Sequence, residues 1–156
     1  MLDWPTQANL WQKITRGSRR QTVPLEAHRS REVSVSICQK VVAIIDDDDG
    51  MRDGLANLLA AAGYLTEAYG SGEAFIGAAM KSEAGCLVVD IHLGDITGVE
   101  LGRHLLAMGL TFPFIFMTGS DDPTIRKQAM EFGCVAYLQK PFPPNQLVKA
   151  ITEAIG

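Results

Sequence analysis

From Lys40 onward, the sequence alternates between short apolar runs and segments with the periodicity of an amphipathic helix. The apolar runs are VVAII, LTEAY, CLVVD, FIFMT and VAYLQ, at residues 41–45, 65–69, 86–90, 114–118 and 135–139. Between them, apolar residues recur three, four and seven positions apart, as on one face of a helix. These positions are Leu55, Leu58, Leu59 and Ala62; Leu101, Leu105 and Met108; Ile125, Ala129 and Phe132; and Leu147, Ile151 and Ala154. Five strands alternating with five helices predict an α/β fold, a doubly wound five-stranded parallel sheet with helices on both faces.

Two further patterns support this fold. The strand runs are apolar throughout, as a sheet covered on both faces requires. Helix ends carry their usual signals: Thr97 with Glu100 fits a capping box, and Asp122 before Pro123 fits an N-cap followed by proline. We also expect His104 to pack near the apolar stripe of its helix. Residues that tolerate positive φ stand where helices should end, at Gly63, Gly109 and Gly133.

Charge divides the chain into two parts. Residues 1–40 carry seven Lys or Arg and three Asp or Glu, whereas residues 41–156 carry seven basic and 15 acidic residues. Residues 1–38 also show no sustained periodicity, so we expect a disordered basic arm there and one folded domain at 39–156. The acidic balance of the domain argues against nucleic acid as its direct ligand. With no secretory signal and no apolar stretch near the about 20 residues of a membrane span, we expect a cytoplasmic protein.

Polar residues stand at the ends of four of the predicted strands. Asp46 and Asp47 follow the first, Asp90 ends the third, Thr118 ends the fourth, and Lys140 follows the fifth. Because ligands of such sheets bind outside the carboxyl ends of the strands, these side chains should converge on one crevice. Carboxylates held together repel, and a bound cation relieves the repulsion. Asp oxygens without His or Cys favour a hard ion, above all Mg²⁺.

A lysine and a hydroxyl opposite a metal ion would form a cradle for a phosphoryl group. Lys140 could pair with one phosphoryl oxygen and Thr118 could donate to another. Asp90 is then the candidate nucleophile, because a carboxylate can form an acyl phosphate. We expect the remaining aspartates of the run, Asp48 and Asp49, to be solvated, with Asp49 capping the next helix.

Four segments carry a family resemblance: IIDDDDGMRDGL, CLVVDIHLGDITGVEL, FIFMTGSDD and YLQKPF. Together they make residues 41–155 resemble the receiver domain of bacterial response regulators. The resemblance implies a flavodoxin-like fold with strand order 2-1-3-4-5. It also implies that Asp90 accepts a phosphoryl group from a phosphohistidine, in a two-component system or phosphorelay.

The resemblance further assigns roles to individual residues. It implies Mg²⁺ ligands at Asp46, Asp47, Asp90 and the backbone carbonyl of His92, with Asp46 acting mostly through water. It also makes Thr118 the switch hydroxyl and Tyr137 the switch aromatic. Lys140 joins Asp90 and Thr118 as a catalytic residue, and the peptide bond between Lys140 and Pro141 is expected to be cis.

The implied partners are proteins. They are a sensor histidine kinase or a histidine phosphotransfer protein as donor, and a downstream protein target. Because the chain ends directly after the last predicted helix, we expect a stand-alone receiver without a DNA-binding output domain. Its chemistry would be self-catalysed phosphotransfer and weak autodephosphorylation, so we do not expect an enzyme.

The chain departs from the family pattern in the loop after Asp90. Relatives usually have Met-Pro three and four positions after the acceptor, where this chain has Leu93 and Gly94. Loss of the proline is expected to loosen the loop. His92 has two open interpretations: it tunes the access of hydrolytic water, or it is an ordinary exposed loop residue.

Two other functions fit parts of the sequence. A haloacid-dehalogenase-type phosphatase begins with strand-Asp-x-Asp-Gly-Thr, and DDDG at 47–50 resembles this signature. However, Met51 replaces the threonine, and Glu153 is the only acid after Lys140. A pseudo-receiver that only binds partners is the other alternative, against which the complete set of polar residues argues.

Overall fold

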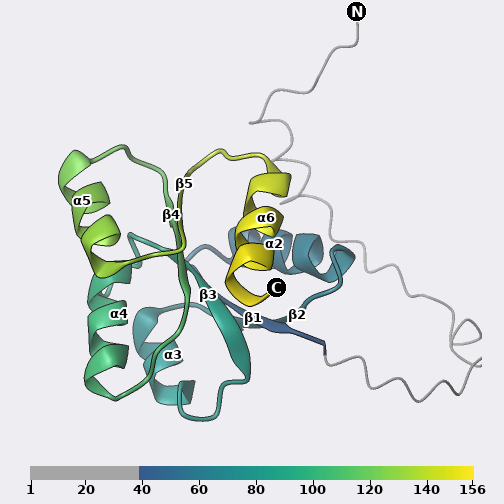
Figure 1. The fold of residues 1–156 in the computed structure, drawn as a ribbon, viewed down its shortest axis with the longest axis horizontal. Coiled ribbons are helices and arrows are strands. Elements are labelled where there is room, and N and C mark those ends of the chain that lie inside the picture. Colours follow the sequence, from purple (N-terminus) through teal and green to yellow (C-terminus); the bar gives the residue numbers. More distant parts are fainter. Residues whose placement is uncertain (1–38) are drawn as a thin grey trace, which may run out of the picture.

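The computed structural model describes residues 39–156, so the predicted basic arm at 1–38 lies outside the described residues. A five-stranded parallel sheet lies between two layers of helices (Figure 1). The elements in chain order are β1 (Val41–Ile45), α2 (Asp49–Ala61), β2 (Leu65–Tyr69), α3 (Gly72–Ala78), β3 (Ala84–Asp90), α4 (Gly98–Ala107), β4 (Phe114–Thr118), α5 (Pro123–Phe132), β5 (Ala136–Gln139) and α6 (Pro144–Ile155). The strand order β2-β1-β3-β4-β5 confirms the predicted topology. Relative to the predicted runs, β3 begins two residues earlier and β5 one residue later.

The core has two halves, one on each face of the sheet. Val42 and Ile44 of β1 pack with the apolar residues of α2 and α6. Ala43 and Ile45 point the other way and pack with those of α3, α4 and α5. Figure 1 shows the same division, with α2 and α6 side by side on one face. Central strands must therefore be apolar at every position, because successive side chains enter opposite halves of the core.

The edge strand β2 departs from the expected apolar run. None of its residues is fully buried, and Leu65 is 48% exposed. The strand has a neighbouring strand on one side only, so a continuous apolar sequence is not needed there. The Glu67 carboxylate instead accepts hydrogen bonds from Tyr69 and Ser82, which tie the strand to the segment before β3.

The helix termini confirm most of the predicted caps. The Thr97 and Glu100 capping box is present, and the Asp122 side chain accepts from the backbone of Thr124. The glycines predicted at helix ends all have positive φ: Gly63, Gly109 and Gly133. The cap before α2 was predicted wrongly, since Asp48 rather than Asp49 accepts from the Met51 amide.

Two residues of α4 also differ from prediction. Met108 is the C-cap and is 38% exposed, and His104 is exposed rather than packed on the apolar stripe. Both lie in the last turn of the helix or just beyond it. The apolar stripe of α4 that reaches the core is formed by Val99, Leu101 and Leu105.

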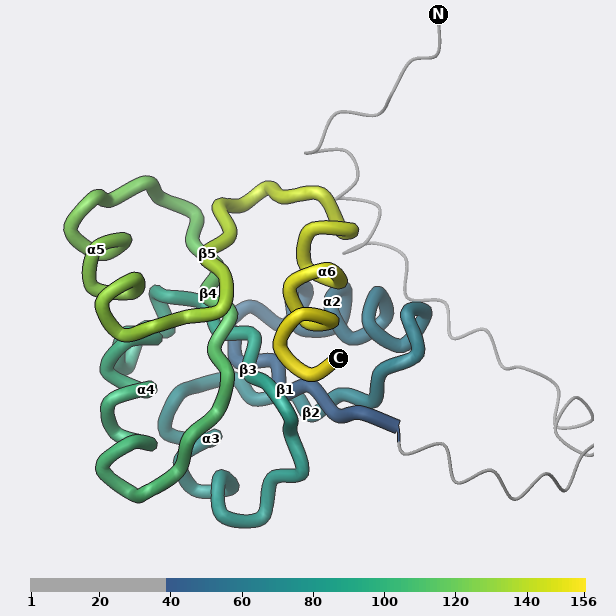
Figure 2. The backbone as a smooth tube through the Cα atoms, in the orientation of Figure 1, coloured from purple at the N-terminus to yellow at the C-terminus, as the bar shows by residue number. Residues whose placement is uncertain are grey.

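The position of the site follows from the strand order. The chain leaves β1 through α2 on one face of the sheet and leaves β3 through α4 on the other face (Figure 2). The carboxyl ends of β1 and β3 are adjacent, but the segments that follow them run to opposite faces of the sheet. A gap therefore opens between these two segments. This gap lies next to the ends of β4 and β5, which complete the same edge.

Candidate functional site

The first acidic pair follows β1 and its two members differ in environment. Asp46 is fully buried, and its backbone amide still donates to the Tyr69 carbonyl of β2 at 3.2 Å. Its Oδ1 accepts from the Asp48 amide at 3.0 Å, while Oδ2 faces Lys140. Asp47, the next residue, is exposed. The end of β1 therefore presents one carboxylate held inside the site and one at its opening.

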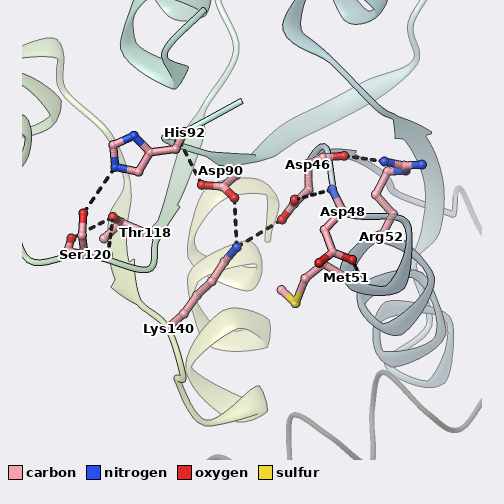
Figure 3. Close-up of polar contacts among 9 residues, drawn as sticks. All are labelled: Asp46, Asp48, Met51, Arg52, Asp90, His92, Thr118, Ser120 and Lys140. Carbon is pink, nitrogen blue, oxygen red and sulfur yellow. Dashed lines mark hydrogen bonds and ion pairs between the residues drawn. The ribbon is translucent and has the colours of Figure 1, made fainter. Parts of the chain in front are cut away.

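Asp90, the predicted phosphoacceptor, is the last residue of β3 and is 8% exposed. Its Oδ1 accepts a hydrogen bond from the His92 amide at 3.0 Å. Its Oδ2 lies 3.0 Å from the Lys140 ammonium (Figure 3). Both oxygens are thus oriented by neighbours, yet the side chain keeps some access to solvent.

The three predicted carboxylates come together. Asp46, Asp47 and Asp90 each offer an oxygen, and these atoms all lie within 4.8 Å of one another. An all-oxygen donor set with clustered negative charge fits a hard divalent cation such as Mg²⁺. The His92 carbonyl stays a predicted ligand; the bond from the His92 amide to Asp90 places this residue beside the cluster.

Lys140 brings a positive charge into this cluster. Its ammonium lies 3.2 Å from Asp46 Oδ2 and 3.0 Å from Asp90 Oδ2, and its side chain is 21% exposed. The Lys140 amide donates to the Thr118 carbonyl at 2.7 Å, which fixes the residue at the end of β5. The predicted cis peptide bond between Lys140 and Pro141 is confirmed.

Burial and charge perturb the ionisation of two of these groups. Burial, followed by repulsion from Asp90, raises the pKa of Asp46, although the Asp48 amide and Lys140 offset part of the rise. Burial alone would lower the pKa of Lys140, but the charges of Asp46 and Asp90 outweigh it and raise that pKa. The ammonium therefore stays charged, and the site favours any further cation or proton near Asp46.

The predicted switch residues lie side by side but are not hydrogen bonded to the acceptor. Thr118 is buried, and its hydroxyl donates to the Ser120 carbonyl at 2.8 Å and accepts from the Ser120 amide at 3.2 Å. Within residues 39–156, the Tyr137 hydroxyl is buried without a partner of hydrogen-bond geometry. Burial raises the pKa of the Tyr137 phenol, and the neighbouring Thr118 hydroxyl offsets part of this rise. The Arg126 guanidinium covers the Tyr137 ring at 6.0 Å from its centroid.

Three contacts at the site were not predicted from the sequence. Arg52 of α2 donates to the Asp46 carbonyl at 2.6 Å (Figure 3). Arg52 also pairs with Asp49. His92 is exposed, and its Nε2 lies 3.3 Å from Ser120 Oγ, across the site from β3 to β4. The spacing of Arg52 and Asp49 on a helix was a usable signal for their pairing. Nothing in the sequence indicated Ser120.

A doubly wound sheet with an acidic cluster and a lysine at the carboxyl ends of its strands has the arrangement expected of the receiver class of signalling proteins. The family model of the response regulator receiver domain matches residues 42–152. The chain is 36% identical over 115 residues to the transcriptional regulatory protein FixJ of Azorhizobium caulinodans, a match that covers 74% of this chain and 54% of that protein. It is 30% identical over 115 residues to the response regulator protein TodT of Pseudomonas putida F1, covering 74% of this chain and 51% of that protein.

Solved structures agree with this family. A crystal structure of FixJ-N matches with a TM-score of 0.70 and 34% identity over 74% of this chain and 93% of that one. A CheY-like receiver domain protein from Methanospirillum hungatei JF-1 has a TM-score of 0.70 and 25% identity over 75% of this chain and 94% of that one. The chain therefore belongs to the response regulator receiver domain family of two-component signalling.

The comparisons also bound what is known of the whole protein. The chain spans about half the length of the curated relatives it matches, so the absence of an output domain stays a prediction. Within residues 39–156, every helix is too short or too polar to cross a bilayer. Asp49, which a phosphatase signature would place beside Asp47, instead pairs with Arg52 on α2.

Proposed function

We propose that this domain accepts a phosphoryl group from a phosphohistidine onto Asp90. The observation that carries the proposal is that Asp90 shares the Lys140 ammonium with Asp46 and also lies in the acidic cluster with Asp46 and Asp47. A carboxylate with a cation and a cation-binding cluster beside it is prepared to receive a dianionic group. The donor is a sensor histidine kinase or a histidine phosphotransfer protein.

The proposed transfer forms one bond and breaks one. An Asp90 oxygen attacks phosphorus, the P–N bond of the phosphohistidine breaks, and its electron pair returns to the imidazole ring. The product is an acyl phosphate, which water later hydrolyses to inorganic phosphate and the free carboxylate. Mg²⁺ held by Asp46, Asp47, Asp90 and the His92 carbonyl would neutralise charge on the phosphoryl oxygens.

Lys140 has two proposed roles in this step. In the resting state its ammonium offsets the charges of Asp46 and Asp90, which keeps the buried carboxylates together. After transfer it pairs with an oxygen of the phosphoryl group on Asp90, close to its present position. The positive charge is thus in place before the reaction and needs little reorganisation.

Phosphorylation is proposed to change a protein-binding face. Thr118 would exchange its bonds to Ser120 for a phosphoryl oxygen, and Tyr137 would move further into the space beside it. Two arrangements of this pair would shift the face made by α5, β5 and α6 between two states. A downstream protein, rather than nucleic acid, is the proposed reader of this face. We assign the activity to the cytoplasm and regard the domain as a phosphorylated switch rather than an enzyme.

The proposal is tested by labelling with a small phosphodonor. Incubation with acetyl phosphate and Mg²⁺ should add one phosphoryl group, detected as a mass increase that hydroxylamine removes. Asp90→Asn should not be labelled, whereas Asp53→Asn, which changes an exposed acid on α2, should be labelled like wild type. Undiminished labelling of Asp90→Asn would refute the assignment, and an unlabelled wild-type protein would support a pseudo-receiver.

A further inference from the structure

The loop between β3 and α4, residues 91–97, has a conformation that proline could not adopt. Gly94 has a φ of +88°, whereas the proline ring holds φ near −65°. The replacement of proline by glycine therefore goes with a different loop conformation and does more than remove a restraint. The looseness expected of this loop stays a prediction, and several contacts in the structure hold the loop in place.

The loop is packed on both sides. The Leu93 side chain is 3% exposed and belongs to the core half formed with α3, α4 and α5. His92 and Thr97 form an isolated antiparallel bridge, which closes the loop on itself. A Cβ atom at the buried Gly72 of α3 would lie 2.8 Å from Ile96, so the loop and the start of α3 are in direct contact.

Asp95 makes the polar part of this contact. Its Oδ2 accepts from the Glu73 amide at 3.1 Å, in the first turn of α3. The adjacent amide of Ala74 is satisfied separately by Ser71 Oγ at 3.0 Å. Slight burial raises the pKa of the Asp95 carboxylate. Hydrogen bonds from the amides of Ile96, Glu73 and Gly72 outweigh this effect, so the Asp95 pKa is lowered. The carboxylate is thus charged and held by backbone donors from two segments.

The same loop reaches the phosphoacceptor site. Its His92 amide donates to Asp90, and its His92 ring contacts Ser120. A Cβ atom at Gly94 would lie 3.7 Å from Asp47 Oδ2, so the loop also borders the exposed acid of the cluster. Any displacement of residues 92–94 would therefore move groups next to two of the three carboxylates.

We propose that Asp95 is a positioning residue, which fixes the β3–α4 loop to α3 and thereby holds the cation and phosphoryl site in shape. The proposal rests on the proposed function, because it assigns the purpose of the contact to the chemistry at Asp90. A negative side chain at this position supplies through hydrogen bonds the restraint that a proline would supply covalently.

The test compares three variants of the full chain. Asp95→Ala removes the contact, Asp95→Asn keeps an acceptor oxygen, and Ser71→Ala removes a neighbouring hydrogen bond from α3 without touching the loop. Amide hydrogen exchange is measured over residues 91–97, and the Mg²⁺ affinity is measured by titration calorimetry. Asp95→Ala should exchange faster in the loop and bind Mg²⁺ severalfold more weakly. Asp95→Asn should recover much of both, and Ser71→Ala should change exchange only near residues 73–75.

The outcomes separate the two proposals. Loop exchange in Asp95→Ala equal to that of wild type would overturn the contact itself. Faster loop exchange with an unchanged Mg²⁺ affinity would overturn the positioning role while leaving the contact intact. A wild-type protein that binds no Mg²⁺ would refute the proposed function, and the positioning role with it.

Discussion

The Lys140 ammonium lies 3.0 Å from the Asp90 carboxylate, although the two residues are separated by 50 positions in the chain. Each stands at the end of a strand, and β4 is the one strand between them in the sheet. Asp90, the proposed phosphoacceptor, is consequently paired with a cation in the unphosphorylated domain. This pairing makes the charge balance of the site sensitive to single substitutions.

Replacing Lys140 should impair phosphorylation. Lys140→Ala leaves the buried Asp46 and the acceptor Asp90 without their shared cation. Loss of one preorganised donor typically lowers a rate on the order of a hundredfold, and we expect a fall of this size in labelling by acetyl phosphate. Lys127→Ala, which removes an exposed lysine on α5, serves as the control and should be labelled normally. Normal labelling of Lys140→Ala would contradict the proposed role.

Neutralising Asp46 should stabilise the domain when no divalent cation is present. Burial raises the pKa of Asp46, which means that the native state disfavours its charge relative to the unfolded state. Asp46→Asn removes this charge with little change in shape, so its melting temperature in EDTA should exceed that of wild type. The same variant should gain less from added Mg²⁺. A lower melting temperature in EDTA would contradict the inference.

The advantage of Asp46→Asn should depend on pH. Because the native pKa of Asp46 is raised, the native state binds more protons than the unfolded state between the ordinary carboxyl pKa and the raised one. The contribution of Asp46 to the free energy of unfolding therefore falls as pH rises through that window. We expect the stability difference between the variant and wild type to be largest at neutral pH and to approach zero below about pH 4. Urea unfolding at a series of pH values in EDTA measures it.

Removing the Tyr137 hydroxyl should stabilise the unphosphorylated domain. This hydroxyl is buried without a hydrogen-bond partner in the part of the chain that the structure describes, and such a group costs about 1–3 kcal/mol. Tyr137→Phe should therefore raise the free energy of unfolding in urea. Tyr64→Phe is the matched control, because its hydroxyl contacts Thr152 Oγ1 at 3.2 Å and its loss should bring no gain. Equal effects of the two substitutions would argue against an energetic cost of the buried Tyr137 hydroxyl.

Packing between α4 and α5 leaves no room at Gly102. A Cβ atom there would lie 2.4 Å from Cζ of Phe132, whose ring packs edge-on against Phe114. Gly102→Ala should lower the free energy of unfolding by about 1–3 kcal/mol through overpacking. Gly77→Ala is a helical control, because a Cβ atom there would have nothing within 4 Å among the described residues, and it should be neutral or stabilising. A harmless Gly102→Ala would show that Phe132 moves aside easily.

Much of the candidate site could be predicted because it depends on strand ends. In a parallel sheet, the last residue of each strand meets the same edge, so Asp46, Asp90, Thr118 and Lys140 could be grouped from the chain order of apolar runs. The structure confirms that the carboxylates of Asp46, Asp47 and Asp90 come together and that Lys140 pairs with two of them. Their chemical roles stay predictions, for which the labelling experiment is the test.

Contacts between loops could not be predicted in the same way. The tie of Asp95 to the Glu73 amide and the contact of His92 with Ser120 join segments whose relative position depends on helix packing. That Asp48 rather than Asp49 is the N-cap likewise depended on the residue at which α2 begins after β1. The exposure of Leu65 followed from the place of β2 at the edge of the sheet.

The sequence by itself therefore determined the alternation of strands and helices and the identity of the residues at the strand ends, because local periodicity and chain order suffice for both. Only the tertiary structure decided which of the acids is buried, which two of them pair with the Lys140 ammonium, and which contacts hold the loop after Asp90. These features depend on distances between segments far apart in the chain. Such distances are set by the packing of helices on the two faces of the sheet.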